Sequence, residues 1–299
     1  GVLVDQEPYF ITVDVPRATP EVVRFADYAG LLDQDAPPGA LTFLVGMAPS
    51  GEVRIEDLAR LPHLLVAGAT GSGKSVFLRG LVASLTRKRS PEQLRLLIVD
   101  PKQVDFLPFE DLPHLMLGGV LSDPGEAITA LADMIEHEVA TRRPKLKALG
   151  ASSALEFYEA GGSVEDLPQV VVLVDEFADL AATLDRDDRA TFMTVIQRYG
   201  QLTRAFGIYL VLATQRPSVQ VITGDIKANL TARVALKVQA PQDSVTILGR
   251  GGAERLRDRG DLLFDHAGRT QRLQGFLATT ADAQQAVRRW WPSGGGARK

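Results

Sequence analysis

Short runs of consecutive apolar residues recur along the chain and alternate with longer segments of helical pattern. Strands that are buried on both faces of a parallel sheet have this continuous apolar character. We predict five such strands, at His63–Ala67, Leu94–Val99, Val170–Val174, Ile208–Ala213 and Arg233–Val238. Helices are predicted between them, notably at Ser75–Leu85, Gly125–Leu149 and Arg189–Arg204. This alternation predicts an α/β fold in which helices flank a mostly parallel sheet.

The first part of the chain has a different pattern. Phe10–Val15 alternates apolar and polar residues, which predicts a strand, and Leu41–Val45 is a second short apolar run. Between them, Thr19 followed by Pro20 is typical of a helix start, and this helix is predicted to end near Leu32. We therefore expect a small N-terminal α/β appendage over residues 1–53.

The main domain is predicted over residues 54–284. A hairpin of Asp261–Phe264 with Thr270–Leu277 is expected to close it. The glycine-rich residues 285–299 are predicted to form a C-terminal tail that is partly disordered.

Composition narrows the possible chemistry. The chain has 299 residues, 45% of them hydrophobic, which suits a globular protein with a large core. It has no cysteine, which excludes disulfides, thiolate catalysis and cysteine-bound zinc. The histidines do not have metal-ligand spacing and are predicted to be structural or solvated; they are His63, His114, His137 and His266.

Charge and hydropathy bear on partners and location. The 33 basic and 37 acidic residues give a net charge of −4, which excludes a protein whose whole surface is basic. Nucleic acid would have to bind a local surface or a channel assembled from several subunits. No apolar run is long enough to span a bilayer, so we predict a cytoplasmic piece without membrane contact of its own. Because the chain begins with Gly1, membrane attachment through segments outside this piece stays open.

One segment matches the phosphate-binding pattern G-x-x-x-x-G-K-[ST], between a predicted strand and a predicted helix. Backbone N–H groups of such a loop, together with the helix N-terminus, bind phosphates. Lys74 is expected to reach the β- and γ-phosphates of ATP, and Ser75 to hold Mg²⁺. The nucleotide-binding residues are predicted to be Gly68, Ala69, Thr70, Gly71, Ser72, Gly73, Lys74, Ser75 and Val76.

Two acidic residues follow the apolar run Val170–Val174. Asp175 is expected at the carboxyl edge of the sheet, where it would hold Mg²⁺. Glu176 is then placed to act as the general base that activates water. The alternative is an acidic pair that merely caps a helix.

The order of the strands adds information. Leu94–Val99 is inserted between the phosphate-loop strand and the strand that ends at Asp175, an arrangement that resembles RecA-like P-loop ATPases. Gln215 follows a further strand and could sense the γ-phosphate, although it could also be an ordinary polar strand end.

Longer strings resemble the FtsK/SpoIIIE family of DNA translocases, within the wider FtsK–HerA group. The resemblance covers about residues 41–264 and includes Pro62–Gly68, Asp175–Leu180, Leu212–Ser218, Val221–Asn229, Gly251–Glu254 and Gly260–Phe264. It implies a homo-oligomer, a hexameric ring around double-stranded DNA, with ATP bound between neighbouring subunits. It also assigns the arginine that acts on the neighbouring subunit's ATP to Arg204, which by itself is an unremarkable helix-end residue.

The resemblance implies two DNA-contacting segments. One contains Arg216 and Lys227; the other spans residues 239–250 and ends at Arg250. Where the family has basic residues in the second segment, this chain has Pro241 and Val245, which should weaken contacts with phosphates. The leading hypothesis is an ATP-driven translocase of duplex DNA. The alternative is a related secretion or conjugation ATPase that moves protein or a nucleoprotein.

Overall fold

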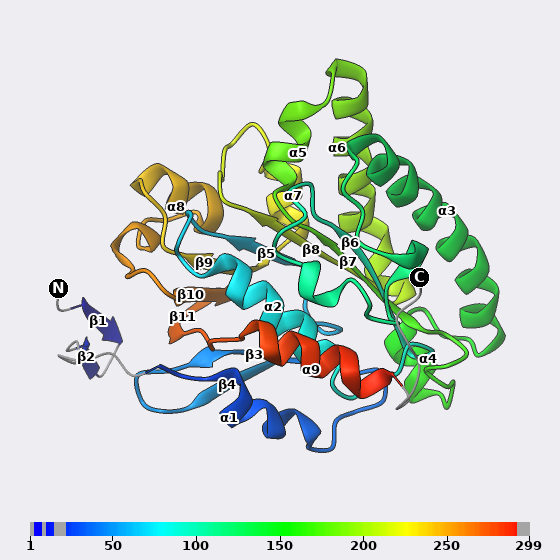
Figure 1. Cartoon of the computed structure of the whole chain (residues 1–299), viewed down its shortest axis with the longest axis horizontal. Coiled ribbons are helices and arrows are strands. Elements are labelled where there is room, and N and C mark those ends of the chain that lie inside the picture. The colour runs from blue at the N-terminus through cyan, green and yellow to red at the C-terminus, as the bar shows by residue number, and fades with distance from the viewer. Residues whose placement is uncertain (1–2, 8–9, 15–21, 292–299) are drawn as a thin grey trace.

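A nine-stranded sheet forms the centre of the molecule in the computed structural model, which describes residues 3–7, 10–14 and 22–291 (Figure 1). The strand order is β4-β3-β11-β10-β9-β5-β8-β7-β6. The bounds are β3 Thr42–Met47, β4 Val53–Asp57, β5 Leu64–Ala67, β6 Leu94–Val99, β7 Gln169–Val174, β8 Ile208–Thr214, β9 Ala232–Leu236, β10 Asp261–His266 and β11 Arg269–Gln274. The strands from β9 to β6 are parallel to one another, as predicted.

Helices cover both faces of this sheet (Figure 1). Along β7, Val171 and Leu173 pack into the core on one face, and Val170 and Val172 pack into the core on the other. The first face is covered by α2 and α9, and the second by α3, α5, α6, α7 and α8. The helices from α2 on have the bounds α2 Lys74–Leu85, α3 Pro124–Ala148, α4 Ala154–Glu159, α5 Phe177–Thr183, α6 Arg186–Leu202, α7 Gly224–Asn229, α8 Pro241–Leu248 and α9 Thr280–Trp290.

The antiparallel half of the sheet corrects one expectation. The hairpin of β10 and β11 does not close the domain but lies inside the sheet, between β9 and β3. Its outer strand pairs with β3 at Gln274 and Met47, and β4 then forms the edge. The strand predicted at Leu41–Val45 therefore joins the main sheet, and the boundary predicted at residue 53 falls at the first residue of β4.

The two ends of the chain differ from the sequence prediction in detail. β1 (Leu3–Glu7) and β2 (Phe10–Asp14) form a separate two-stranded sheet. The predicted start of the following helix, at Thr19 and Pro20, lies outside the described residues. The described part of that helix consists of α1 (Phe25–Tyr28) and a 3₁₀ turn over Ala29–Asp33. The predicted tail begins within α9, and residues 292–299 lie outside the described ranges.

α9 is capped at its start and anchored to the main domain at its end. Thr279 and Asp282 form a reciprocal cap at its start, and the indole Nε1 of Trp290 donates to the Thr86 carbonyl at 2.6 Å. Within the described part of the chain, none of the helices has the length and apolar character needed to cross a bilayer.

His63 lies just before β5 and is 1% exposed. Its Nδ1 accepts a hydrogen bond from the Leu210 backbone N–H at 2.9 Å, which ties the start of β5 to β8. Its φ of 61° is in the left-handed region, which is uncommon for a residue with a side chain. Burial lowers the pKa of His63 to about 4, and the charge of Arg204 acts in the same direction.

Acid should therefore destabilise the fold through His63. Because its pKa is lower in the folded state than in the unfolded chain, its full contribution is present above about pH 6.5 and is lost as the pH falls toward 4. We expect His63→Asn, which keeps an acceptor and tolerates the left-handed φ, to reduce the loss of unfolding free energy between pH 7 and 4.5 by about 2 kcal/mol. Urea unfolding of both chains at the two pH values measures this, and equal losses would contradict it.

Candidate nucleotide site

The phosphate loop lies between β5 and α2, as predicted. Gly71 and Gly73 have φ values of 82° and 106°, which favour glycine. At Gly73 glycine is also required by space, because a Cβ there would lie 2.8 Å from the Gly260 backbone nitrogen. The Gly260 N–H donates to the Ser72 carbonyl at 2.7 Å, so the segment before β10 packs directly on the loop.

Lys74 is the buried centre of the site. Its side chain is 2% exposed and pairs with Asp175, while its Nζ lies 3.0 Å from Glu176 Oε1. The two carboxylates follow β7 and the lysine follows β5, so strands parallel to one another bring them to the same edge of the sheet. The structure thus assembles the three residues that the sequence predicted.

Gln215 lies between the two halves of the site because β8 separates β5 from β7 in the sheet. Its Oε1 accepts from Thr70 Oγ1 at 2.6 Å, and its backbone N–H donates to Glu176 Oε2 at 3.1 Å. The residue therefore contacts the phosphate loop and the predicted general base at once. This position favours the predicted sensing role over an ordinary strand end.

The acidic pair is held in an unusual environment. Burial raises the pKa of Asp175 to about 6, and the ammonium of Lys74 opposes this shift. Glu176 has a φ of 50° and its side chain is 1% exposed. A left-handed backbone at a buried acidic residue is costly and is found mainly where function requires it.

Two residues of this site were missed by the sequence analysis. Asp105 accepts a hydrogen bond from Ser75 Oγ. Lys102 Nζ lies 3.5 Å from Glu176 Oε1 and 3.3 Å from Asp179 Oδ2. Both belong to the loop after β6, and the polar run that follows Val99 was the available signal.

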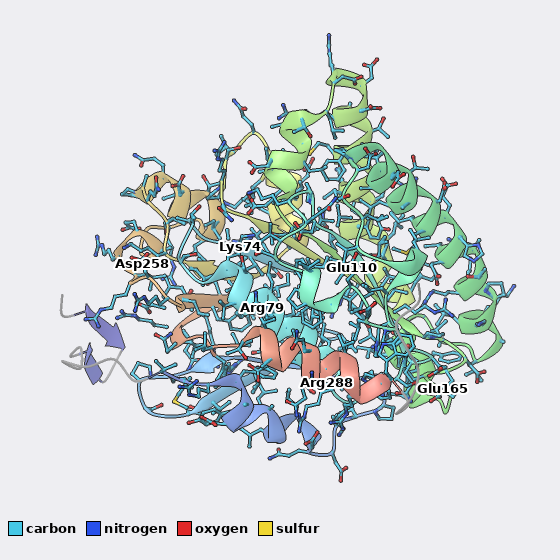
Figure 2. All side chains as sticks on the ribbon, viewed as in Figure 1. Lys74, Arg79, Glu110, Glu165, Asp258 and Arg288 are labelled. Atoms are coloured by element: carbon cyan, nitrogen blue, oxygen red, sulfur yellow. The ribbon has the colours of Figure 1, made fainter. Side chains whose placement is uncertain are left out.

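A cavity of about 950 Å³ opens beside the phosphate loop. It reaches from Lys74 and Ser75 to the segment Arg257–Asp261, and Val76 is part of its wall. Figure 2 labels Lys74 at the start of α2 and Asp258, which also lines the cavity. Its volume is in the range that accommodates a small-molecule ligand.

The residues present suit a magnesium ion that is shared with phosphates. Among the described residues, no group of three or more histidine or acidic side chains could hold a metal alone. Mg²⁺ in nucleotide sites typically takes one or two protein ligands and completes its shell with water and phosphate oxygens. The hydroxyl of Ser75 and the carboxylate of Asp175 are groups that could serve as ligands of this kind.

Arg204 lies far from this site in its own chain. It is in the 3₁₀ turn Thr203–Phe206 before β8, and its guanidinium donates to the Arg60 carbonyl at 3.1 Å. β8 runs parallel to β5, so the seven residues of β8 separate Arg204 from the phosphate-loop edge by about 20 Å. The structure does not bring Arg204 to the ATP site of the same subunit.

Of the predicted DNA-contacting residues, Lys227 is on α7 and Arg250 follows α8, whereas Arg216 lies just after β8. Arg216 and Arg250 are exposed, and Lys227 Nζ donates to the Val245 carbonyl at 3.2 Å. The two predicted segments therefore contact each other. The Val245 side chain is itself exposed on this surface.

Comparisons with known proteins show which family and which fold the chain resembles. A family model described as the FtsK/SpoIIIE family matches residues 32–219. DNA translocase SpoIIIE of Bacillus subtilis (strain 168) is 38% identical over an alignment of 290 residues, which covers 93% of this chain and 36% of that protein. DNA translocase FtsK of Clostridium tetani (strain Massachusetts / E88) is 42% identical over an alignment of 253 residues, which covers 83% of this chain and 33% of that protein. The chain thus spans about a third of the length of these relatives.

Two solved structures are similar over most of the chain. The pCW3 conjugation coupling protein TcpA, in its monomer form with ATPγS, has a TM-score of 0.76 at 25% identity and covers 96% of this chain and 81% of its own. The cytoplasmic domain of the Thermomonospora curvata type VII secretion ATPase EccC has a TM-score of 0.74 at 24% identity, with coverages of 90% and 33%. The predicted P-loop ATPase fold, with helices flanking the sheet, is confirmed.

Proposed function

The chain belongs to the FtsK/SpoIIIE family, and from this premise we propose that it hydrolyses ATP and uses the energy to move double-stranded DNA. The observation that supports hydrolysis best is Lys74, which lies within ion-pair distance of both Asp175 and Glu176. A cation for the phosphates, a carboxylate for the metal and a second carboxylate for the water are thus in one place.

Binding of ATP exchanges the partners of Lys74. Its ammonium leaves the two carboxylates for the β- and γ-phosphates, and the N–H groups at the start of α2 face the same phosphates. Ser75 and Asp175 would hold Mg²⁺, and the ion would neutralise charge that develops on the transferred phosphoryl group. The base and ribose occupy the cavity beside Val76.

Glu176, no longer paired with Lys74, then acts on water. Its carboxylate accepts a proton from the water whose oxygen attacks the γ-phosphorus, and the bond to the β-phosphate oxygen breaks. Gln215 contacts Glu176 through its backbone and the phosphate loop through its side chain. Through these two contacts it senses the γ-phosphate.

The position of Arg204 supports an oligomer. An arginine about 20 Å from its own phosphate loop can contribute only to another subunit's site. Head-to-tail contact, with Arg204 of one subunit facing the phosphate loop of the next, generates a ring when the rotation between subunits closes, and we propose the hexamer that the family resemblance implies. Duplex DNA then contacts Arg216, Lys227 and Arg250.

Duplex DNA should stimulate ATP hydrolysis by this chain at low salt, more than an equal mass of single-stranded DNA. We expect Arg216→Ala to lower the slope of log affinity against log salt by about one, because one phosphate contact is lost. Filter binding and ATPase assays over a salt series measure both quantities. Arg186→Ala, at an exposed arginine on α6, is the control and should keep the slope.

The exposed Val245 favours the second candidate, an ATPase that moves protein or a nucleoprotein. An apolar side chain lies where a phosphate contact is expected. Hydrolysis without any stimulation by duplex DNA at low salt would contradict the translocase and leave this alternative.

A further inference from the structure

The loop after β6 places two charged side chains in contact with residues of the ATP site. Asp105 accepts the hydrogen bond that Ser75 Oγ donates. Lys102 is ion-paired with Glu176 and with Asp179. The proposed function gives neither Asp105 nor Lys102 a role.

A buried carboxylate fixes the shape of this loop. Asp100 is 1% exposed, and its Oδ1 accepts from the Lys102 backbone N–H at 3.1 Å. Its Oδ2 accepts from the backbone N–H groups of Val104 and Asp105, each at 3.1 Å. Because a buried carboxylate is costly unless its oxygens are hydrogen-bonded, this arrangement holds both Lys102 and Asp105 in place before any ligand binds.

Lys102 becomes important when Lys74 changes partners. Among the described residues, Lys74 and Lys102 are the cations within 4.0 Å of Glu176. Once phosphates attract Lys74, Glu176 faces the carboxylate of Asp175, and Lys102 is the ion-pair partner that stays. A carboxylate that loses its cation beside a like charge is repelled by that charge and rotates away from it.

Asp105 orients a residue on the phosphate-loop side of the site, Ser75. The Ser75 hydroxyl has one hydrogen and two lone pairs. Since its hydrogen points to Asp105, its lone pairs are directed away from Asp105 and are available to a cation. Partners that orient a metal ligand in this way raise metal affinity by about 10- to 100-fold.

We propose that Lys102 and Asp105 are positioning residues of the ATPase site: Lys102 keeps Glu176 oriented after Lys74 has moved to the phosphates, and Asp105 orients the Ser75 hydroxyl toward Mg²⁺. This inference rests on the proposed hydrolysis of ATP at the same site. It assigns function to a loop whose main chain is held by Asp100.

For Lys102, the test separates turnover from binding. Lys102→Met should lower kcat for ATP at least tenfold and leave the Kd of ATPγS within about twofold, while Lys102→Arg restores most of the rate. In chains that also carry Glu176→Gln, Lys102→Met should have no further effect on the residual rate, because the residue acts through Glu176. Lys147→Met, at an exposed lysine on α3, is the control.

Three results would overturn the role of Lys102: an unchanged kcat, an equal loss in the presence of Glu176→Gln, or a parallel loss of ATPγS affinity. If the unaltered chain does not hydrolyse ATP, the proposed function fails, and if Glu176→Gln hydrolyses ATP normally, the general-base role of Glu176 fails. If Glu176→Gln is inactive and Lys102→Met is fully active, only this inference fails.

For Asp105, binding is measured without turnover. Asp105→Ala should raise the Mg²⁺ concentration that half-maximally tightens ATPγS binding by about tenfold, and leave ATPγS affinity in EDTA unchanged. Asp133→Ala, at an exposed aspartate on α3, is the control. An unchanged Mg²⁺ midpoint, or an equal loss of affinity in EDTA, would overturn the assignment, and thermal unfolding of each variant checks that it folds.

Discussion

Replacing Glu176 with glutamine should leave ATP binding intact and lower the rate of ATP hydrolysis by about 100- to 10,000-fold. Glutamine has nearly the same shape, so the contact from the Gln215 backbone N–H can persist. It cannot accept a proton from the attacking water, however. Loss of its negative charge also removes one ion-pair partner of Lys74 and thereby favours transfer of Lys74 to the phosphates.

The measurement is steady-state release of phosphate together with equilibrium binding of ATP. Glu110→Gln makes the same chemical change at an exposed residue, labelled in Figure 2, and should retain the unaltered rate. Turnover by Glu176→Gln at the unaltered rate would refute the general-base role. Loss of ATP binding in the same variant would show that Glu176 contributes to the binding of ATP instead of to its hydrolysis.

The sequence predicted the parts of the site that depend on local spacing and on strand direction. The phosphate loop is local, because the glycines, Lys74 and Ser75 follow one another between a strand and a helix. The ion pair between Lys74 and Asp175 follows from the direction of the strands, since parallel strands place their carboxyl ends on the same side of the sheet. Both features were predictable without knowledge of side-chain packing.

Lys102 and Asp105 were not predictable in this way. Their positions depend on the hydrogen bonds of Asp100 to the backbone of an irregular loop, and no period or motif specifies that loop. The place of the β10–β11 hairpin was missed for a similar reason. Its contact with β3 rests on one paired position, Gln274 with Met47, which an alternating pattern cannot reveal.

The second half of α9 was predicted to belong to the glycine-rich tail over residues 285–299. The structure of the helix depends on the cap formed by Thr279 with Asp282 and on the bond from Trp290 to the Thr86 carbonyl. The cap was readable from the sequence, whereas a contact between residues 204 positions apart was not.

Replacing Arg204 with alanine should leave ATP binding intact and lower DNA-stimulated turnover by about 1,000- to 100,000-fold, as expected for an arginine that acts on a transferred phosphoryl group. Arg204 is exposed and lies near the amino ends of the parallel strands, whereas its own phosphate loop lies at their carboxyl ends. The loss of turnover should therefore appear in the neighbouring subunit's site. Arg204→Lys should recover little, because lysine lacks the planar fork of donors. Arg60→Ala removes another arginine side chain at the same edge and should have a small effect.

Mixing subunits distinguishes action between subunits from a structural defect. A chain with Arg204→Ala retains Glu176, and a chain with Glu176→Gln retains Arg204, so each can supply what its neighbour lacks. In rings formed from equal amounts of the two, about a quarter of the interfaces combine an intact Glu176 with an intact Arg204, and activity should return in that proportion. A mixture no more active than its two components measured separately would refute action between subunits. The same mixture restores nothing if Arg204 merely supports the fold through its contact with the Arg60 carbonyl, because each chain would carry its own defect.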